Sequence, residues 1–294
     1  MSDFHIASYW GKQKNNAVRC GLCPHRCNIG DNCVGLCGVR TNIKGELRAT
    51  GYGHVCAIAL DPIEKKPLYM FKPGKKILSI GGYGCNLHCP FCQNSSISME
   101  YKKAHGHNSE FPKEVITPQI VKDIAQKTVD DGNVGVAYTY NEPLIGFEFL
   151  LDCAKEIRKI GLVNALVTNL YINEKPLAEL LPYIDAINVD IKGYYGKIYN
   201  KVGGTLEEVK RRVEQAVEVC HVEVTTLIIP EENENDIEDI AKWISAIDPN
   251  IPYHLSRFFP RYHYSDRKPT THEAMYRHEK IAKRYLKNVF LGNM

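Results

Sequence analysis

Short runs of apolar and β-branched residues alternate with amphipathic stretches along the chain from Lys76 onward. Such runs predict strands and the stretches between them predict helices, so the pattern is typical of a parallel sheet or barrel. Thr117 before Pro118 fits the start of one expected helix. The expected strands cover residues 77–81, 134–140, 162–168, 186–191, 222–229 and 253–257.

Six strands over this length are too few for a closed eight-stranded barrel, which needs about 250 residues. We therefore predict an α/β fold built on a partial, six-stranded parallel barrel of the TIM type. A doubly wound open sheet is the alternative, but no G-x-G-x-x-G motif follows the first expected strand. In a parallel barrel the chemistry lies at the carboxyl ends of the strands, and candidate residues are expected there.

The first quarter of the chain has a different character, because it is rich in Cys, Gly and loop-forming residues and has few periodic runs. We expect a small Cys-rich metal-binding module at 1–75. The partial barrel with a C-terminal helix then covers 76–294. The segment from Ala59 to Tyr69 mixes charged and apolar residues and is interpreted as a surface loop.

Composition narrows the class of protein. With 294 residues and 44% hydrophobic content, the chain is neither disordered nor fibrous. The net charge of +3, from 37 basic and 34 acidic residues, does not demand a nucleic-acid partner. No apolar run of about 18 residues and no basic-then-apolar leader occurs, so we expect a cytoplasmic protein without a membrane partner. Most of its 11 cysteines precede residue 93, and in that compartment they are read as metal ligands before disulfides.

A three-cysteine motif follows the strand expected at 77–81. Cys85, Cys89 and Cys92 have C-x3-C-x2-C spacing, and the glycines just before them allow a tight bend. Three thiolates can hold a four-iron cluster and leave one iron open to a small molecule. The alternatives are a zinc knuckle or three incidental thiols, although structural zinc sites need four ligands.

A second constellation lies near the N-terminus. Cys20, Cys23, Cys27 and Cys37 have C-x2-C-x3-C-x9-C spacing, with Cys33 as an additional candidate. Four thiolates suit either a tetrahedral zinc ion or a fully ligated four-iron cluster, and the sequence does not separate the two. Such a closed site would be structural or would relay electrons. Disulfides are the alternative.

Polar residues gather at the carboxyl ends of the expected strands. On the inner face of a barrel such residues are costly unless a polar ligand meets them. Each also has an ordinary explanation: a helix start, a turn, a structural ion pair or a structural histidine. The candidates are Glu142, Thr168, Asn169, Asp190, Lys192, His254 and Arg257.

The C-x3-C-x2-C spacing, with Phe91 before the last cysteine, resembles the signature of the radical S-adenosylmethionine superfamily. The resemblance extends from about Cys20 to Pro260. The N-terminal cysteines and residues 59–69, 187–190 and 256–258 resemble the AmmeMemoRadiSam subgroup, which is related to pyruvate formate-lyase (glycyl-radical enzyme) activating enzymes. The family has glycines at the positions of Tyr140, Asn141 and Leu170.

This resemblance implies two cofactors, a [4Fe-4S] cluster and S-adenosylmethionine. In that family the reduced cluster cleaves S-adenosylmethionine, and the resulting 5'-deoxyadenosyl radical abstracts hydrogen from the substrate. It implies that Glu142 binds the amino group of S-adenosylmethionine. The remaining implied cofactor contacts are Phe91, Thr168, Asn169 and Asp190, and the implied catalytic residues are Asp190, Lys192, His254 and Arg257.

The resemblance also implies partners. An electron donor of the flavodoxin or ferredoxin kind would reduce the cluster. If the likeness extends to substrate, the hydrogen comes from a glycine of a partner protein, and a small-molecule substrate is the alternative. A non-catalytic iron–sulfur or zinc binding module is the second class of function.

Overall fold

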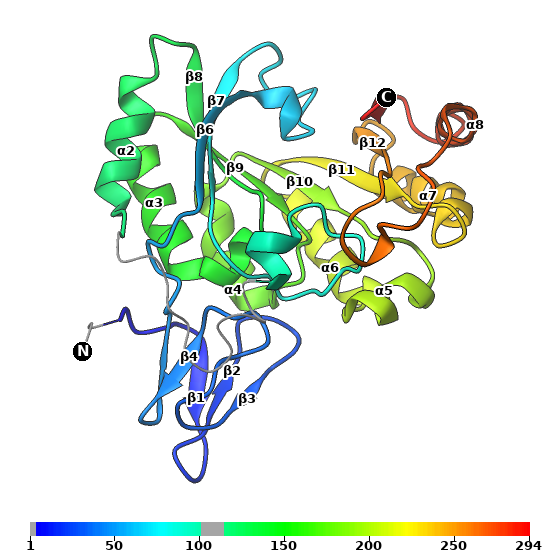
Figure 1. Cartoon of the computed structure of the whole chain (residues 1–294). Coiled ribbons are helices and arrows are strands. Elements are labelled where there is room, and N and C mark those ends of the chain that lie inside the picture. The colour runs from blue at the N-terminus through cyan, green and yellow to red at the C-terminus, as the bar shows by residue number, and fades with distance from the viewer. Residues whose placement is uncertain (1–3, 101–114) are drawn as a thin grey trace.

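One large sheet organises the computed structural model, which describes residues 4–100 and 115–294. Its eight strands follow the order β13-β12-β11-β10-β9-β8-β7-β6 (Figure 1). The strands are β6 (Ala57–Pro62), β7 (Lys76–Gly81), β8 (Asn133–Tyr138), β9 (Val163–Thr168), β10 (Ala186–Asp190), β11 (His221–Ile228), β12 (Tyr253–Arg257) and β13 (Val289–Gly292).

The six strands expected from the sequence are confirmed as β7 to β12, which run parallel to one another. The predicted partial parallel barrel is likewise confirmed, but it is wider than expected. Strand β13 adds a further parallel strand to β12, and β6 adds an antiparallel strand to β7. Both additions are edge strands, which pair on one side only in the part of the chain that the structure describes.

Helices follow most of the parallel strands and cover the outer face of the sheet (Figure 1). Thr117 caps the first of them as expected, since its hydroxyl accepts a hydrogen bond from the Ile120 N–H at 3.3 Å. Within residues 4–100 and 115–294, no helix is both long and apolar enough to cross a membrane. The α-helices are α2 (Pro118–Lys127), α3 (Phe147–Lys159), α4 (Glu174–Leu180), α5 (Gly196–Val202), α6 (Leu206–Val217), α7 (Ile237–Ile247) and α8 (His272–Ala282). The short helices are η1 (Ile63–Lys65), η2 (Ser96–Glu100), η3 (Pro143–Gly146), η4 (Leu181–Tyr183), η5 (Glu234–Asp236) and η6 (Tyr262–Tyr264).

The N-terminal region forms two small sheets beside the barrel (Figure 1). One contains β1 (Trp10–Lys12), β2 (Val18–Cys20) and β3 (Asn28–Ile29), and the other pairs β4 (Thr41–Ile43) with β5 (Glu46–Arg48). A buried ion pair joins this region to α3, because both carboxylate oxygens of Glu148 accept from Arg40 at 3.0 Å. The module boundary at residue 75 stays a prediction, although β6 within that range already belongs to the large sheet.

A segment before β7 fills the inside of the barrel. Ala137, Ala165 and Ala186 lie side by side in register on the inner face, where their small side chains leave space. Ile63 and Leu68, both fully buried, pack into that space. We call residues 63–70 the plug. The expectation that residues 59–69 form a surface loop is therefore wrong, because the apolar members of this charged segment face inward.

The carboxylate of Glu223 on β11 fastens the plug to the barrel. It accepts hydrogen bonds from the backbone N–H groups of Tyr69 at 3.0 Å and Met70 at 2.9 Å. It also contacts the Nε2 atoms of His221 at 2.9 Å and His254 at 2.6 Å. Burial raises the pKa of Glu223, but the hydrogen bonds from both histidines and from the Met70 N–H outweigh the effect of burial. The net result is a pKa lowered to about 2. The carboxylate is therefore charged at neutral pH.

Candidate active site

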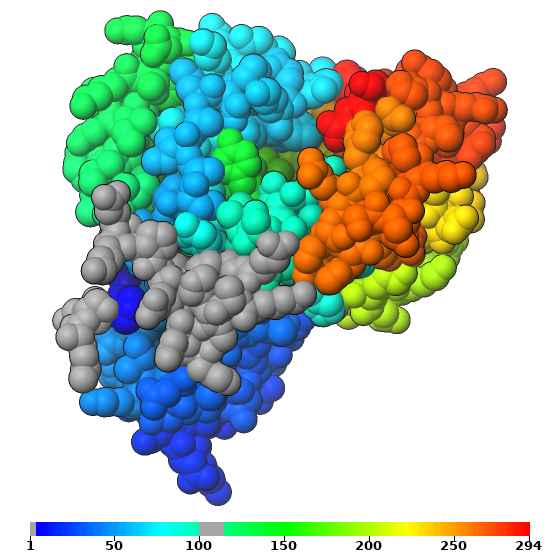
Figure 2. All heavy atoms as spheres, viewed as in Figure 1, coloured from blue at the N-terminus to red at the C-terminus, as the bar shows by residue number. Residues whose placement is uncertain are grey.

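A cavity of about 340 Å³ opens at the carboxyl ends of the parallel strands. Figure 2 shows the molecule hollowed between the light blue segment that includes β6 and β7 and the orange segment that follows β12. Side chains from the cysteine loop, the plug and the strands line the cavity together. Among them are Cys85, Cys89, Phe91, Cys92, Glu142, Thr168, Asn169, Asp190 and Lys192. The structure thus brings most of the residues expected from the sequence to one place.

The loop after β7 presents all three cysteines of the central motif to this cavity. Cys85 and Cys89 are buried and Cys92 is half-buried. Burial raises the pKa of Cys89 to about 11, and the nearby ammonium of Lys192 opposes that shift. Gly84 is required in the loop because its φ is +78° and a Cβ there would lie 2.2 Å from the carbonyl oxygen of Cys37.

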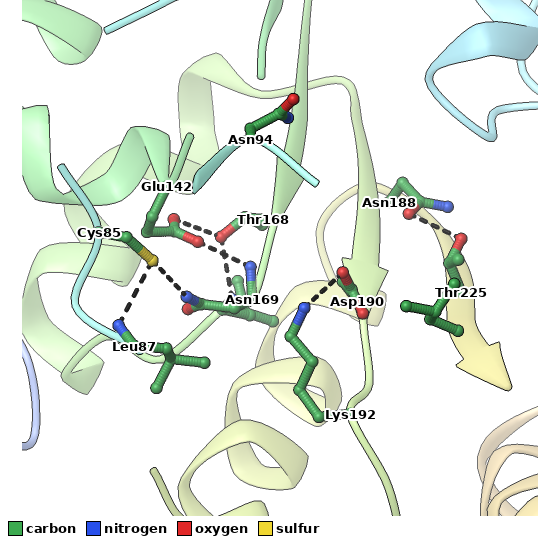
Figure 3. A network of polar contacts seen from close by, with 12 residues as sticks. Cys85, Leu87, Asn94, Glu142, Thr168, Asn169, Asn188, Asp190, Lys192 and Thr225 are labelled. Carbon is green, nitrogen blue, oxygen red and sulfur yellow. Dashed lines mark hydrogen bonds and ion pairs between the residues drawn. The ribbon is translucent and has the colours of Figure 1, made fainter. Parts of the chain in front are cut away.

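Glu142 lies at the centre of a buried polar network beside the cysteine loop (Figure 3). One carboxylate oxygen accepts from the Thr168 hydroxyl at 2.6 Å and the Leu144 N–H at 3.0 Å. The other accepts from the Asn169 N–H at 2.8 Å. Burial raises the pKa of Glu142 to about 7 even though these hydrogen bonds and the charge of Lys192 lower it. A cationic group bound here would therefore shift Glu142 toward its charged form.

Asn169 connects Glu142 to the cysteine loop. Its amide nitrogen donates to the side-chain oxygen of Asn86 at 3.0 Å and lies 3.8 Å from the sulfur of Cys85 (Figure 3). The module reaches the same loop, because His25 Nε2 lies 2.7 Å from the carbonyl oxygen of Asn86. Two different parts of the chain therefore hold the residue that follows Cys85.

Asp190 and Lys192 form an ion pair at the end of β10, with Nζ 2.6 Å from Oδ2 (Figure 3). Burial lowers the pKa of Lys192, but the charges of Asp190 and Cys89 outweigh it and raise the pKa overall. The other carboxylate oxygen of Asp190 is buried and has no hydrogen-bond partner among the described residues. It is thus an acceptor within the cavity wall that a ligand could satisfy.

Two residues that stand where the family has glycine keep a left-handed backbone. The φ angle is +71° at Tyr140 and +54° at Leu170. Left-handed residues other than glycine are strained and persist where their surroundings fix them. Asn141, at the third such position, uses its side chain to accept from the Gly82 N–H and to donate to the Gly84 carbonyl oxygen. The side chain of Asn141 thereby holds the backbone at the start of the cysteine loop.

His254 and Arg257 are not brought to the cavity, although both were expected in the catalytic group. His254 is buried against Glu223 and the ring of Phe290. The Arg257 guanidinium donates to the Thr270 carbonyl oxygen at 2.7 Å and contacts His272. Their contacts favour structural roles, because neither belongs to the described cavity lining.

Sequence reasoning missed several residues of the cavity wall. Lys65 and Lys66 come from the plug, and Thr225 comes from β11, where its hydroxyl donates to Asn188 at 2.9 Å. The available signal was strand alternation, since residues 223, 225 and 227 of β11 share one face. The lysines gave no comparable signal, because a dense charge run before a strand usually lies on the surface.

The N-terminal cysteines lie near one another but not in a closed arrangement. Burial and the neighbouring Cys37 raise the pKa of Cys23 to about 12. Cys20 and Cys27 also raise it, by a smaller amount. All four are free thiols. In the part of the chain that the structure describes, no three His, Cys, Asp or Glu side chains are grouped closely enough to hold a metal ion.

Comparison with known proteins identifies the class. Residues 79–244 match the sequence model of the Radical SAM superfamily. An uncharacterized protein of Methanocaldococcus jannaschii is 38% identical, over 98% of this chain and 85% of its own length. The pyruvate formate-lyase-activating enzyme of Clostridium pasteurianum is 27% identical, over 58% of this chain and 72% of its own length.

A solved structure agrees at the level of the fold. SuiB of Streptococcus suis, bound to S-adenosylmethionine, superposes with a TM-score of 0.52 at 14% identity, covering 72% of this chain and 48% of that one. The match of more than half the chain to the superfamily model carries more weight than this likeness. The chain belongs to the radical SAM superfamily and takes a [4Fe-4S] cluster and S-adenosylmethionine as cofactors.

The residues present fit a cluster of this kind. Three cysteine side chains of one loop line one cavity, and three thiolates are the donor set that leaves one iron of a four-iron cluster open. A four-iron cluster is larger than a single ion, so its sulfur ligands lie farther apart than those of a mononuclear site. Because buried thiols with raised pKa values hold their protons, binding of the cluster releases protons from them.

Proposed function

We propose that this protein is an enzyme that cleaves S-adenosylmethionine reductively and abstracts hydrogen from a substrate held in the same cavity. When bound, a reduced [4Fe-4S] cluster supplies the electron that splits S-adenosylmethionine into methionine and a 5'-deoxyadenosyl radical. Cys85, Cys89 and Cys92 are the proposed cluster ligands. The observation that carries the proposal is that these thiols and the Glu142 network line one cavity.

The remaining residues bind and orient. Glu142 would accept a hydrogen bond from the amino group of S-adenosylmethionine, with Thr168 and the Asn169 N–H holding its carboxylate in place. The unpartnered oxygen of Asp190 offers a further acceptor, and Lys192 fixes the orientation of that carboxylate. Phe91 is 3% exposed and lines the cavity, where its ring would exclude water beside the cofactor.

Anaerobic reconstitution tests the proposal directly. Protein loaded with iron and sulfide is mixed with S-adenosylmethionine and dithionite, and 5'-deoxyadenosine is measured by chromatography. We expect its formation to depend on the protein, the reductant and the iron. A fully loaded protein that forms none would favour a non-catalytic iron–sulfur module.

Glu142→Gln should weaken the binding of S-adenosylmethionine by roughly tenfold or more, because the hydrogen bond to its ammonium loses its charge. Iron content should be unchanged, since no cluster ligand is removed. Equilibrium dialysis with labelled S-adenosylmethionine measures the affinity. Equal affinity in the two proteins would contradict the role of Glu142.

The same measurement has a pH signature. The pKa of Glu142 is raised to about 7, mainly by burial, so protons compete with the ammonium below that pH. Affinity in the wild-type protein should rise as the pH increases from 6 to 8. The Glu142→Gln variant should lack the part of this rise that comes from the carboxylate, because glutamine does not titrate and Lys192, whose charge acts on this position, stays protonated throughout that range.

We further propose that Cys20, Cys23, Cys27 and Cys37 hold a second metal centre, either zinc or an iron–sulfur cluster. Their spacing in the sequence supports this ligand set, and holding a single zinc ion would require the thiols to move closer together than they lie in the structure. Metal analysis of anaerobically purified protein separates the alternatives: about four irons per chain indicate one cluster, and about eight indicate two. Zinc beside about four irons would assign zinc to the module.

The name of the Clostridium relative, an activating enzyme for pyruvate formate-lyase, supports a partner protein as one candidate substrate. Hydrogen abstraction from a glycine of that partner and a flavodoxin- or ferredoxin-like electron donor stay predictions from the sequence. A small molecule is the other candidate. The two lysines that the plug adds to the cavity wall favour the small molecule.

A further inference from the structure

The plug contributes two lysines to the cavity wall. Lys66 is 3% exposed, and its Nζ donates to Asp61 Oδ2 at 2.9 Å. The Tyr140 hydroxyl donates to the same oxygen at 2.9 Å, and the Lys66 ammonium lies 4.6 Å from the centroid of the Tyr140 ring. Lys65 is exposed, and its Nζ lies 3.3 Å from the other oxygen of Asp61. A strained tyrosine, a buried lysine and a shared carboxylate therefore form one fixed unit.

The charges of this unit do not balance. Two ammonium groups, Lys65 and Lys66, share the single carboxylate of Asp61, which leaves one positive charge. Within the described cavity lining the carboxylates are Glu142 and Asp190. Asp190 already pairs with Lys192, and Glu142 is held by its own three donors. Among the described residues neither carboxylate forms an ion pair with Lys65 or Lys66, so the excess charge of the unit is not paired within that lining.

Neutral hydrogen-bonding groups line the same cavity. The hydroxyls of Thr225 and Ser256 line the cavity, as does Asn293, whose amide donates to the Ser256 hydroxyl at 2.9 Å. Ammonium groups next to neutral donors suit an anion, because hydrogen bonds to a charged acceptor are stronger than those to a neutral one. A cationic group beside these two lysines would instead be repelled by their charge.

We propose that Lys65 and Lys66, held by Asp61 and Tyr140, form a subsite that binds a carboxylate or phosphate group of a small-molecule substrate. This inference rests on the proposed function, because it places the substrate in the cavity that takes S-adenosylmethionine. The strain at Tyr140 is consistent with it, since that backbone carries the ring that covers Lys66 and the hydroxyl that orients Asp61.

Two variants test the subsite. Lys65→Met removes an exposed ammonium, and Asp61→Asn combined with Lys65→Met and Lys66→Met removes both ammonium groups together with the carboxylate that they share, so that no charge of the unit is left without its partner. Lys75→Met is the matched control, because Lys75 is an exposed lysine close to the plug that does not line the described cavity. Thermal melts followed by circular dichroism verify that each variant folds.

Malonate and pyrophosphate serve as probes in calorimetric titrations at low salt, with and without S-adenosylmethionine. We expect saturable binding to the wild-type protein and to Lys75→Met. The dissociation constant should rise roughly tenfold or more in the triple variant, and less in Lys65→Met, where the ammonium is solvated. Equal affinity in the wild-type protein and the triple variant, or no saturable binding of either probe, would overturn the subsite.

A neutral probe separates the two candidate substrates. N-acetylglycinamide mimics a peptide glycine, and tighter binding of it than of both anions would also overturn the proposal. Failure of the proposed function has a different result. Wild-type protein loaded with its cluster would then form no 5'-deoxyadenosine with dithionite, whatever affinity the titrations measure for the anions.

Discussion

Cys89→Ala is expected to remove the central cluster and abolish 5'-deoxyadenosine formation. The central motif supplies three thiolates, so loss of one leaves too few protein ligands to hold four irons. Metal at the N-terminal cysteines should remain, because those residues belong to a separate region with its own sheets. Visible absorbance, iron and sulfide content and the product assay measure the three effects.

Cys220→Ala is the matched control, since Cys220 is half-buried and follows α6, outside both cysteine groups. It should keep its iron and its activity. If Cys89→Ala emptied both sites, the division into two centres would be wrong. If it kept full cluster absorbance, a different set of ligands would hold the central cluster.

Glu223→Ala is expected to destabilise the protein by about 3–5 kcal/mol, because it leaves several buried hydrogen-bond donors unsatisfied at about 1–3 kcal/mol each. It leaves the Tyr69 and Met70 N–H groups and the His254 ring without their acceptor inside the barrel. The plug would then lose its attachment to β11. Urea unfolding followed by circular dichroism gives the free energy of unfolding.

Acid dependence provides an independent test of the same carboxylate. The pKa of Glu223 is lowered from 4.5 to about 2. The contribution of its charge to the free energy of unfolding is therefore complete above pH 4.5 and is lost as the pH falls toward 2. Glu223→Gln keeps the size of the side chain but cannot titrate. The stability gap between the wild-type protein and this variant should therefore narrow over that interval, and a constant gap would show that the charge of Glu223 is not involved.

The elements predicted from the sequence were those that carry a strong periodic pattern. Strands β7 to β12 consist of apolar and β-branched runs, because a parallel strand covered on both faces requires them. The edge strands were missed because β6 is followed by a dense charge run and β13 is only Val289–Gly292. The cysteine loop and the Glu142 network were predicted because their positions follow strand ends.

The plug could not be predicted in the same way. Its burial depends on three alanines from three different strands, whose alignment exists only once the sheet has formed. His254 was misplaced for a related reason. Its position on β12 suggested the cavity, but the partner that fixes it, Glu223, lies on a neighbouring strand 31 residues away.

The stretch of chain matched by the superfamily model begins at residue 79, after the plug has ended. The cavity residues matched by the superfamily model and the two lysines of the plug, which line the same cavity, are therefore encoded in separate, consecutive stretches of the chain. Substitutions in the earlier stretch could redirect the enzyme to new molecules while the radical-generating apparatus remained constant, so that selectivity and reactivity can evolve independently.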